Sequence, residues 1–332
     1  MKTRGILGRF EELGERHLLL AHGANVFPLL HVVVYYAVWL ILLAPGAPQP
    51  PLWRWALWPV LVLANFSISV GVLHMHAHRR LFKSAAANRV LELLLALPAG
   101  ATCANMLYTH VFLHHRYGND TGDPTSTIGY ERGPRMLWYW VRFGAYTTYL
   151  TWRALFCLHA PRRWRRMRRR FVIDLSACFC VGVGLGVAGR YGLIDRWGWL
   201  LVFLVPACIC HVNTGYFAWL THQRVSGGRF EALNNVANVL AVLSHNQGFH
   251  SVHHKHPSLH WTEIPDHVGE MLDVSDSLIV PYWMTMTSAW RALHPAGVLA
   301  PMFGGAWKTR CRRALSAQKH RARRVPYFCW ID

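Results

Sequence analysis

Four long apolar stretches constrain the fold of this chain more than any other feature. They cover residues 27–44, 56–73, 171–188 and 198–220, and Asp174 is the only aspartate, glutamate, lysine or arginine inside them. A stretch of about 18 to 20 apolar residues is long enough to cross a bilayer as a helix. Lipid offers no hydrogen bonds to the backbone, so such a stretch satisfies its own peptide groups by coiling. The sequence therefore predicts an all-α integral membrane protein with four transmembrane helices in two hairpins.

The charged residues are strongly lopsided and gather in basic runs. Lysine and arginine number 35 among 332 residues, against 16 aspartates and glutamates. A basic protein can bind nucleic acid, but here the runs flank apolar stretches, as PRRWRRMRRR does at residues 161–170. That distribution is typical of the cytoplasmic side of an inner-membrane protein, next to anionic lipid. We therefore expect both termini in the cytoplasm and no nucleic-acid partner. The arginine run has a second interpretation, which is attraction of an acidic partner protein.

Histidines form three compact boxes, and each box follows an apolar segment. The third box lies in HNQGFHSVHH at residues 245–254 and places rings at i, i+3 and i+4, so the three are expected to face the same way. The other two boxes contain the i, i+4 spacing. Neutral imidazole is the commonest protein ligand for redox-active metals, whereas a lone histidine is more often packed or solvated. The eight candidate ligands are His74, His78, His110, His114, His115, His250, His253 and His254.

The order and separation of the boxes carry a family resemblance. It is densest in HVFLHHRYGNDTGDPTST at residues 110–127 and in GFHSVHHKHPSLHWTEIP at residues 248–265. From about residue 53 to residue 267 the chain resembles the membrane fatty acid desaturase and hydroxylase superfamily, and the second stretch resembles the third box of bacterial acyl desaturases. The resemblance implies two iron ions held by histidines alone, with O2 as co-substrate.

The resemblance also implies a ninth histidine ligand at the end of the last membrane helix. This chain offers His211 and His222, which are close to three helical turns apart and so lie on nearly the same face. At about 1.5 Å per residue they are roughly 16 Å apart along the helix. Only His222 is at the cytoplasmic end, so we predict that His222 binds iron. His211 is expected to hydrogen-bond a neighbouring helix or to line the deeper part of an acyl cavity.

Several further residues near the boxes are candidates for orienting the ligand rings from behind, because imidazole ligands usually donate their second N–H to another group. For the carboxylates among them, an ordinary role in a solvated loop is an equal alternative. The candidates are His76, Asp120, Asp123, His245, Asn246 and Glu263.

Residues 90–107 are apolar enough to cross the membrane, yet they separate two boxes that are expected on the same side. A single crossing is excluded if the boxes share a site, so we predict a shallow or re-entrant helix here, and another at residues 136–158. Residues 1–25 are expected to form an amphipathic helix on the membrane surface. Residues 26–290 would form the membrane domain, with the boxes as a cytoplasmic cap, and residues 291–332 a basic cytoplasmic tail.

The resemblance implies an enzyme, an O2-dependent fatty acid desaturase acting on an acyl chain linked to lipid, to coenzyme A or to acyl carrier protein. Lipid hydroxylases and carotenoid-type oxygenases share the boxes and remain alternatives. A histidine-rich metal-binding membrane protein is a non-enzyme alternative, although its polar residues would extend through the membrane interior. His294 begins HPAG, an imperfect match to the haem motif of cytochrome b5. A separate, ferredoxin-like electron donor is therefore expected.

Overall fold

A computed structural model describes residues 13–16, 19–45, 52–120, 122–130, 133–157, 164–195, 197–222, 232, 244–264, 266 and 267. Most of the predicted N-terminal surface helix, nearly all of residues 223–243 and the whole basic tail at 291–332 lie outside the described residues. The described part is helical, and its only isolated β-bridge joins Leu20 to Phe82. The predicted all-α class is confirmed.

Within the described residues, four helical spans are long and apolar enough to cross a membrane, as predicted. The first is α2, Val26–Leu43, preceded by the short η1, Gly23–Asn25. The second runs without a break through α3, Leu52–Phe66, the π-helix η2, Ser67–Val72, and α4, Leu73–His78. The third is α9, Arg165–Arg190, and the fourth joins the π-helix η5, Leu200–Leu204, to α10, Val205–His222.

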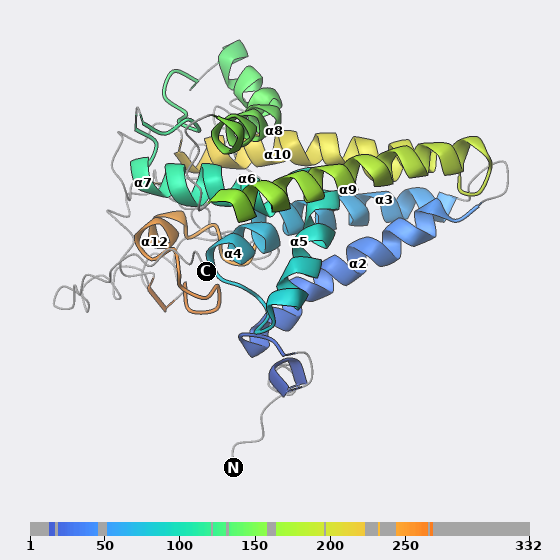
Figure 1. Cartoon of the computed structure of the whole chain (residues 1–332), viewed down its shortest axis with the longest axis horizontal. Helices are drawn as coiled ribbons and strands as arrows, with labels where there is room; N and C mark the ends of the chain where they lie inside the picture. Colours follow the sequence, from blue (N-terminus) through green and yellow to red (C-terminus); the bar gives the residue numbers. More distant parts are fainter. Residues whose placement is uncertain are drawn as a thin grey trace, which may run out of the picture.

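The spans form two hairpins whose connecting ends meet on the side away from the histidine boxes. Figure 1 shows α2, α3, α9 and α10 side by side, with α4, α7 and α12 at the opposite end. At the connecting end, Arg54 donates a 3.0 Å hydrogen bond to the carbonyl of Ala44 and lies 3.8 Å from the Asp195 carboxylate. The Asp195 amide donates to the carbonyl of Leu43 at 3.1 Å. These contacts tie the end of the first hairpin to that of the second.

The segment between the first two boxes enters the protein and returns. It consists of α5, Ala85–Ala99, then α6, Cys103–Met106, the π-helix η3, Leu107–His114, and α7, His115–Tyr117. The two arms, Ala85–Ala99 and Cys103–Tyr117, meet at 86°. Gly100 makes the bend with φ of 58°, a left-handed conformation that costs glycine little. Because the first two boxes lie close together, this geometry fits the predicted re-entrant segment.

The helix α8, Gly133–Phe156, lies along α10, and the short α12, His250–Lys255, carries the third box. Tyr139 of α8 packs with Tyr216, Trp219 and Leu220 of α10. The outer face of α8 exposes large apolar and aromatic side chains. They include Leu137, Trp138, Val141, Tyr149 and Trp152. An exposed stripe of this kind on an amphipathic helix fits the predicted shallow position at the membrane surface.

A buried ionic network fastens α4, α5 and α9 to one another. Glu92 of α5 is 1% exposed and pairs with Arg80, with Arg89 at 3.0 Å and with Arg170 of α9 at 3.0 Å. Arg89 also bonds Asp174 of α9 at 2.5 Å. A carboxylate buried to this degree needs such partners, because desolvation of an unpaired charge is costly.

Candidate metal centre

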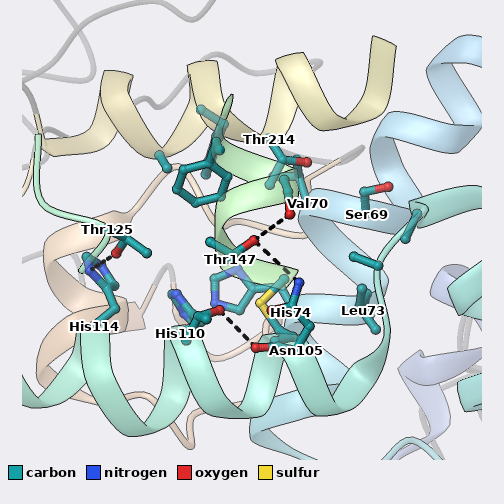
Figure 2. Close-up of a pocket in the computed structure, with 18 of the residues that line it drawn as sticks. Ser69, Val70, Leu73, His74, Asn105, His110, His114, Thr125, Thr147 and Thr214 are labelled. Carbon is teal, nitrogen blue, oxygen red and sulfur yellow. Dashed lines mark hydrogen bonds between the residues drawn. The ribbon is translucent and has the colours of Figure 1, made fainter. Parts of the chain in front are cut away.

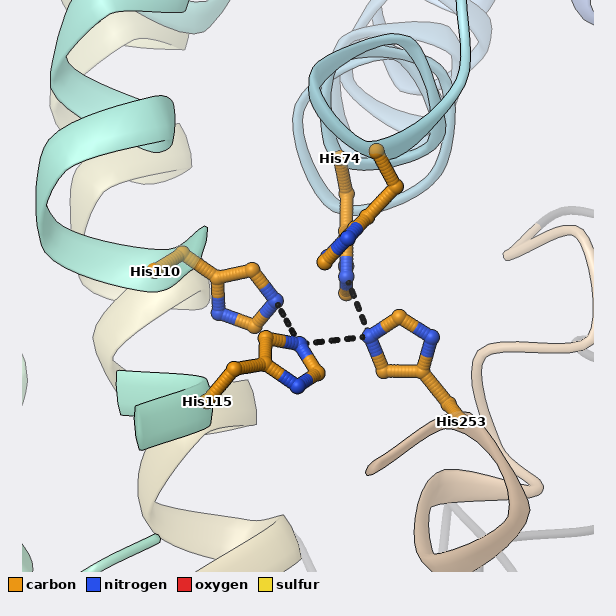
Figure 3. Close-up of side chains that lie close together, drawn as sticks. His74, His110, His115 and His253 are labelled. Carbon is orange, nitrogen blue, oxygen red and sulfur yellow. Dashed lines mark hydrogen bonds between the residues drawn. The ribbon is translucent and has the colours of Figure 1, made fainter. Parts of the chain in front are cut away.

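Five histidines from four elements converge in the first cluster. One ring nitrogen from each can be chosen so that all five nitrogens lie within 4.8 Å of one another. The Nε2 atoms of His74 and His253 are 2.9 Å apart, and His115 Nε2 lies 3.0 Å from those of both His110 and His253. Figure 3 shows these four rings pointing at a common centre. The first cluster consists of His74, His78, His110, His115 and His253.

Four more histidines form the second cluster next to the first. His114 Nε2 lies 3.1 Å from His254 Nε2, and His250 Nε2 lies 3.0 Å from His222 Nε2 and 3.2 Å from His254 Nε2. All four rings are buried. The second cluster consists of His114, His222, His250 and His254.

The helices divide the second and third boxes between the clusters, which the sequence interpretation missed, whereas both histidines of the first box enter the first cluster. His250 and His254 of α12 enter the second cluster, whereas His253 enters the first. At about 100° per residue, His253 and His254 diverge, so the expectation that all three rings face one site was wrong. In η3 the i→i+5 bonding of a π-helix brings His115 beneath His110, and both enter the first cluster. His114 turns to the second.

The donor atoms fit metal ions better than they fit one another. Two ligand nitrogens at a right angle, each about 2.1 Å from one ion, are about 3.0 Å apart. The Nε2 separations in both clusters are 2.9 to 3.2 Å. An imidazole nitrogen carries either a proton or a lone pair. His115 Nε2 can therefore hydrogen-bond both His110 Nε2 and His253 Nε2 only if both of those atoms have the opposite protonation state to its own. The buried Nε2 of His78 has no hydrogen-bond partner among the described residues.

The electrostatics of the third box keep its rings in the metal-binding form. Burial lowers the pKa of His250 and His253 well below the ordinary value, and neighbouring imidazoles lower it further. Both rings are therefore neutral at physiological pH, and each keeps a lone pair for a metal.

Asp123 holds His114 from behind. Its Oδ2 lies 2.6 Å from His114 Nδ1, and its carboxylate also accepts the Thr125 amide at 2.7 Å and the Thr125 hydroxyl at 2.6 Å. Burial alone would raise the pKa of Asp123, but His114 and these hydrogen bonds outweigh it and lower that pKa. An ionised carboxylate fixes the tautomer of His114 with the proton on Nδ1, which leaves Nε2 free for a metal.

Asn119 is a supporting residue that the sequence interpretation did not single out. Its Nδ2 donates to the carbonyl of His222 at 3.2 Å, and its Oδ1 accepts the Thr127 amide at 2.7 Å. The Thr127 hydroxyl bonds the same His222 carbonyl at 3.0 Å. The loop after the second box thereby holds the end of α10, and with it the His222 ring. Asn119 is marked by a left-handed φ of 61°, but this conformation cannot be seen in the sequence.

The other residues predicted to orient the ligand rings lie outside the two clusters. Asp120 and Glu263 are exposed, and Glu263 accepts the amide of His260 at 3.1 Å. Asn246 donates to the carbonyl of Trp261 at 2.8 Å. His245 is fully buried, but its ring lies tilted against that of His31, with centroids 5.0 Å apart, and belongs to neither cluster.

His76 belongs to a third group, with Glu92 and Cys103, whose donor atoms also lie within 4.8 Å of one another. Arg80 lies 3.4 Å from His76 Nε2 and pairs with Glu92. Arg89 and Arg170 each bond the same carboxylate at 3.0 Å. Three guanidinium groups around one carboxylate repel a cation, so this group stabilises the protein and is a poor metal site.

A cavity of about 90 Å³ begins at both clusters and extends between the membrane helices. His74 and His110 of the first cluster and His114, His222 and His250 of the second line it. His211 lines it as well, which is one of the two positions expected for that residue. Figure 2 shows His74, His110 and His114 along one side of this cavity.

Comparisons with known proteins agree with this geometry. Residues 50–286, which include all nine clustered histidines, match the model of the fatty acid desaturase family. The chain is also similar to the beta-carotene ketolase of Paracoccus sp. (strain N81106 / MBIC 01143), with 26% identity over 227 residues, 62% of this chain and 79% of that protein. The part of the chain that the structure describes has four helices long and apolar enough to cross a membrane and two all-histidine clusters compatible with metal ions, and the chain belongs to the fatty acid desaturase family.

Proposed function

We propose that the protein is a di-iron, O2-dependent fatty acyl desaturase of the inner membrane. The observation that carries this proposal is the pair of adjacent all-histidine clusters that open onto one cavity between membrane helices. Five histidines would hold one iron ion and four the other. When bound, the irons would use O2 and electrons to break an unactivated C–H bond, a task that no side chain performs alone.

The proposed reaction converts –CH2–CH2– into –CH=CH–, and it consumes one O2, two electrons and two protons. Two hydrogen atoms leave the chain, and two molecules of water form. The electrons come from outside the chain, and we propose a ferredoxin-like donor on the cytoplasmic side. The acyl group would be linked to lipid, to coenzyme A or to acyl carrier protein.

The side chains contribute positioning and exclusion of water. Asp123 orients the His114 ring, and Asn119 with Thr127 fixes the carbonyl of His222. Burial of the rings keeps bulk water from the clusters, which limits side reactions of O2 chemistry. Leu73 and Phe217 line the cavity beside the clusters, where they would hold an apolar chain against the reacting centre.

Oxidation of a cyclic polyene is a second candidate, because the ketolase from Paracoccus is named for beta-carotene. Ketone formation and hydroxylation insert oxygen into the substrate, whereas desaturation does not. The product therefore separates the candidates.

The test is expression in a host of known lipid composition, with and without O2, followed by mass spectrometry of fatty acids and of supplied beta-carotene. We expect an acyl product two mass units lighter that forms only with O2 and only in cells that hold iron-loaded protein. A product that contains ¹⁸O from ¹⁸O2 would replace desaturation with hydroxylation or ketone formation. If the protein binds zinc alone and forms no oxygen-dependent product, the proposed enzymatic function is refuted.

A further inference from the structure

The deeper part of the cavity is lined with polar groups, although it lies between membrane helices. Four polar side chains from four different elements line it, and Figure 2 labels all four. We call them the polar ring: Ser69, Asn105, Thr147 and Thr214. An acyl chain made only of methylene groups would leave the remaining lone pairs of these oxygen atoms unused.

The polar ring lies at a defined depth below the metal centre. Ser69 precedes His74 by five residues, Asn105 precedes His110 by five, and Thr214 precedes His222 by eight. At about 1.5 Å per residue, these spacings place the ring about 7 to 12 Å from the clusters.

The hydroxyl groups of the polar ring already donate hydrogen bonds to backbone carbonyl groups. Thr147 donates to the carbonyl of Gly144 at 3.0 Å, and Thr214 donates to that of Cys210 at 2.8 Å. Such bonds are common for threonine in membrane helices. A hydroxyl group has one proton but two lone pairs, so the oxygen atoms left facing the cavity can only accept.

Asn105 is held in the same way. Its Oδ1 accepts the Thr151 hydroxyl at 2.7 Å, and its Nδ2 lies 3.4 Å from the hydroxyl oxygens of both Thr147 and Thr148. The amide is therefore engaged by three threonines of α8. The polar ring is thus a preformed set of hydrogen-bond acceptors, and its natural complement is a hydroxyl donor.

His211 precedes Thr214 by three residues on α10 and also lines this space. Its ring lies against two glycines: a Cβ atom at Gly100 would be 2.6 Å from Nε2, and one at Gly144 would be 1.7 Å from Nδ1. No side chain fits at Gly144 while His211 keeps this position.

We propose that the substrate is a long-chain lipid that already carries a hydroxyl group, which the polar ring binds about 7 to 12 Å from the carbon that is oxidised. The inference deepens the proposed function and rests on its placement of substrate in this cavity. The enzyme would then follow a hydroxylating reaction that supplies its substrate.

The test measures binding without turnover, by displacement of the fluorescent polyene cis-parinaric acid from the full-length protein in phosphatidylcholine nanodiscs. The competitors are stearate and stearates with one hydroxyl group at different positions along the chain. One added hydrogen bond contributes about 0.5 to 1.5 kcal/mol, so the best hydroxystearate should compete about 2- to 12-fold more strongly than stearate. Equal competition by every chain would overturn the inference.

The chain offers a matched control for this preference. Thr147→Val and Thr214→Val remove acceptors that face the cavity, and each should bring the ratio of the two affinities close to one. Thr148→Val removes a neighbouring hydroxyl that also donates to the Gly144 carbonyl, at 2.9 Å, and lies 3.4 Å from Asn105 Nδ2, but does not line the cavity. Thr148→Val should keep the wild-type ratio. A preference that survives in both cavity variants would also overturn the inference.

Product analysis keeps this inference separate from the proposed function. If stearate and hydroxystearates are desaturated equally well, the desaturase activity is supported and the proposed hydroxyl-binding site is refuted. If no lipid yields an oxygen-dependent product while the selective displacement persists, the hydroxyl-binding site is supported and the proposed desaturase activity is refuted.

Discussion

His222 and His211 lie on the same face of α10, yet only His222 enters a cluster. We predict that His222→Ala loses about one of two bound irons together with activity, because the second cluster keeps only three rings. His211→Ala should keep both irons, since its ring lies deep in the cavity. Iron content, measured by mass spectrometry after purification of both variants, shows which of the two histidines binds iron. Loss of iron from the His211 variant and not from the His222 variant would contradict the assignment.

Asp123 offers a second comparison among single residues. Asp123→Asn removes the charge that holds the proton of His114 on Nδ1, and we expect iron to leave the second cluster about 10- to 100-fold more readily in competition with a chelator. Asp120→Asn changes an exposed carboxylate in the same loop and is the control. Equal chelator sensitivity in the two variants would show that Asp123 does not support the metal.

Membership of the clusters could be predicted from the residues, whereas their division could not. Spacing in the boxes, the resemblance and the depth of His222 on its helix pointed to all nine rings that the structure brings together. The i, i+4 pattern suggested that His110 and His114 share a face. The π-helical turn of η3 instead pairs His110 with His115, and such a turn has no local sequence signal.

Among the elements, α5 depends on an ionic network that packing of its neighbours keeps from water. Glu92→Gln leaves Arg89, Arg80 and Arg170 around a neutral amide, and loss of one partner from a buried ion pair costs about 3 to 5 kcal/mol. We therefore expect a clear fall in the thermal midpoint of the purified protein in detergent, measured by tryptophan fluorescence. Glu263→Gln, at an exposed carboxylate, should leave the midpoint unchanged. An unchanged midpoint in the Glu92 variant would mean that the network adds no stability.

The re-entrant pair α5 and α6 shows how two weak signals can together predict an element. Hydropathy alone predicted a crossing, but the positions of the first two boxes required a return to the same side. Gly100 supplies the bend at φ of 58°, and Thr102 caps the next helix by accepting the Asn105 amide at 3.0 Å. The side-chain contacts of the polar ring followed from no pattern, because they join residues of distant segments.

For the molecule as a whole, hydropathy located all four spans, and their ends differ by a few residues because helices extend into the cap. The orientation in the membrane and the docking of a donor are properties of the complete surface. The clearest asymmetry lies along α9, where Arg165, Arg166 and Arg169 are exposed at the end near the boxes and Arg190 is exposed at the other.

This asymmetry provides a test of how electrons arrive. If an acidic ferredoxin-like donor docks beside the boxes, changing Arg165, Arg166 and Arg169 together to Gln should slow donor-dependent turnover about tenfold at low salt, because charge attraction raises association rates. The gap from wild type should narrow as salt screens that attraction. Arg170 is left unchanged because it bonds Glu92. Arg190→Gln alters the same helix at its far end and should leave rate and salt response as they are. A triple variant with wild-type rate and salt dependence, at an equal protein level, would restrict these arginines to setting the orientation of the chain in the membrane.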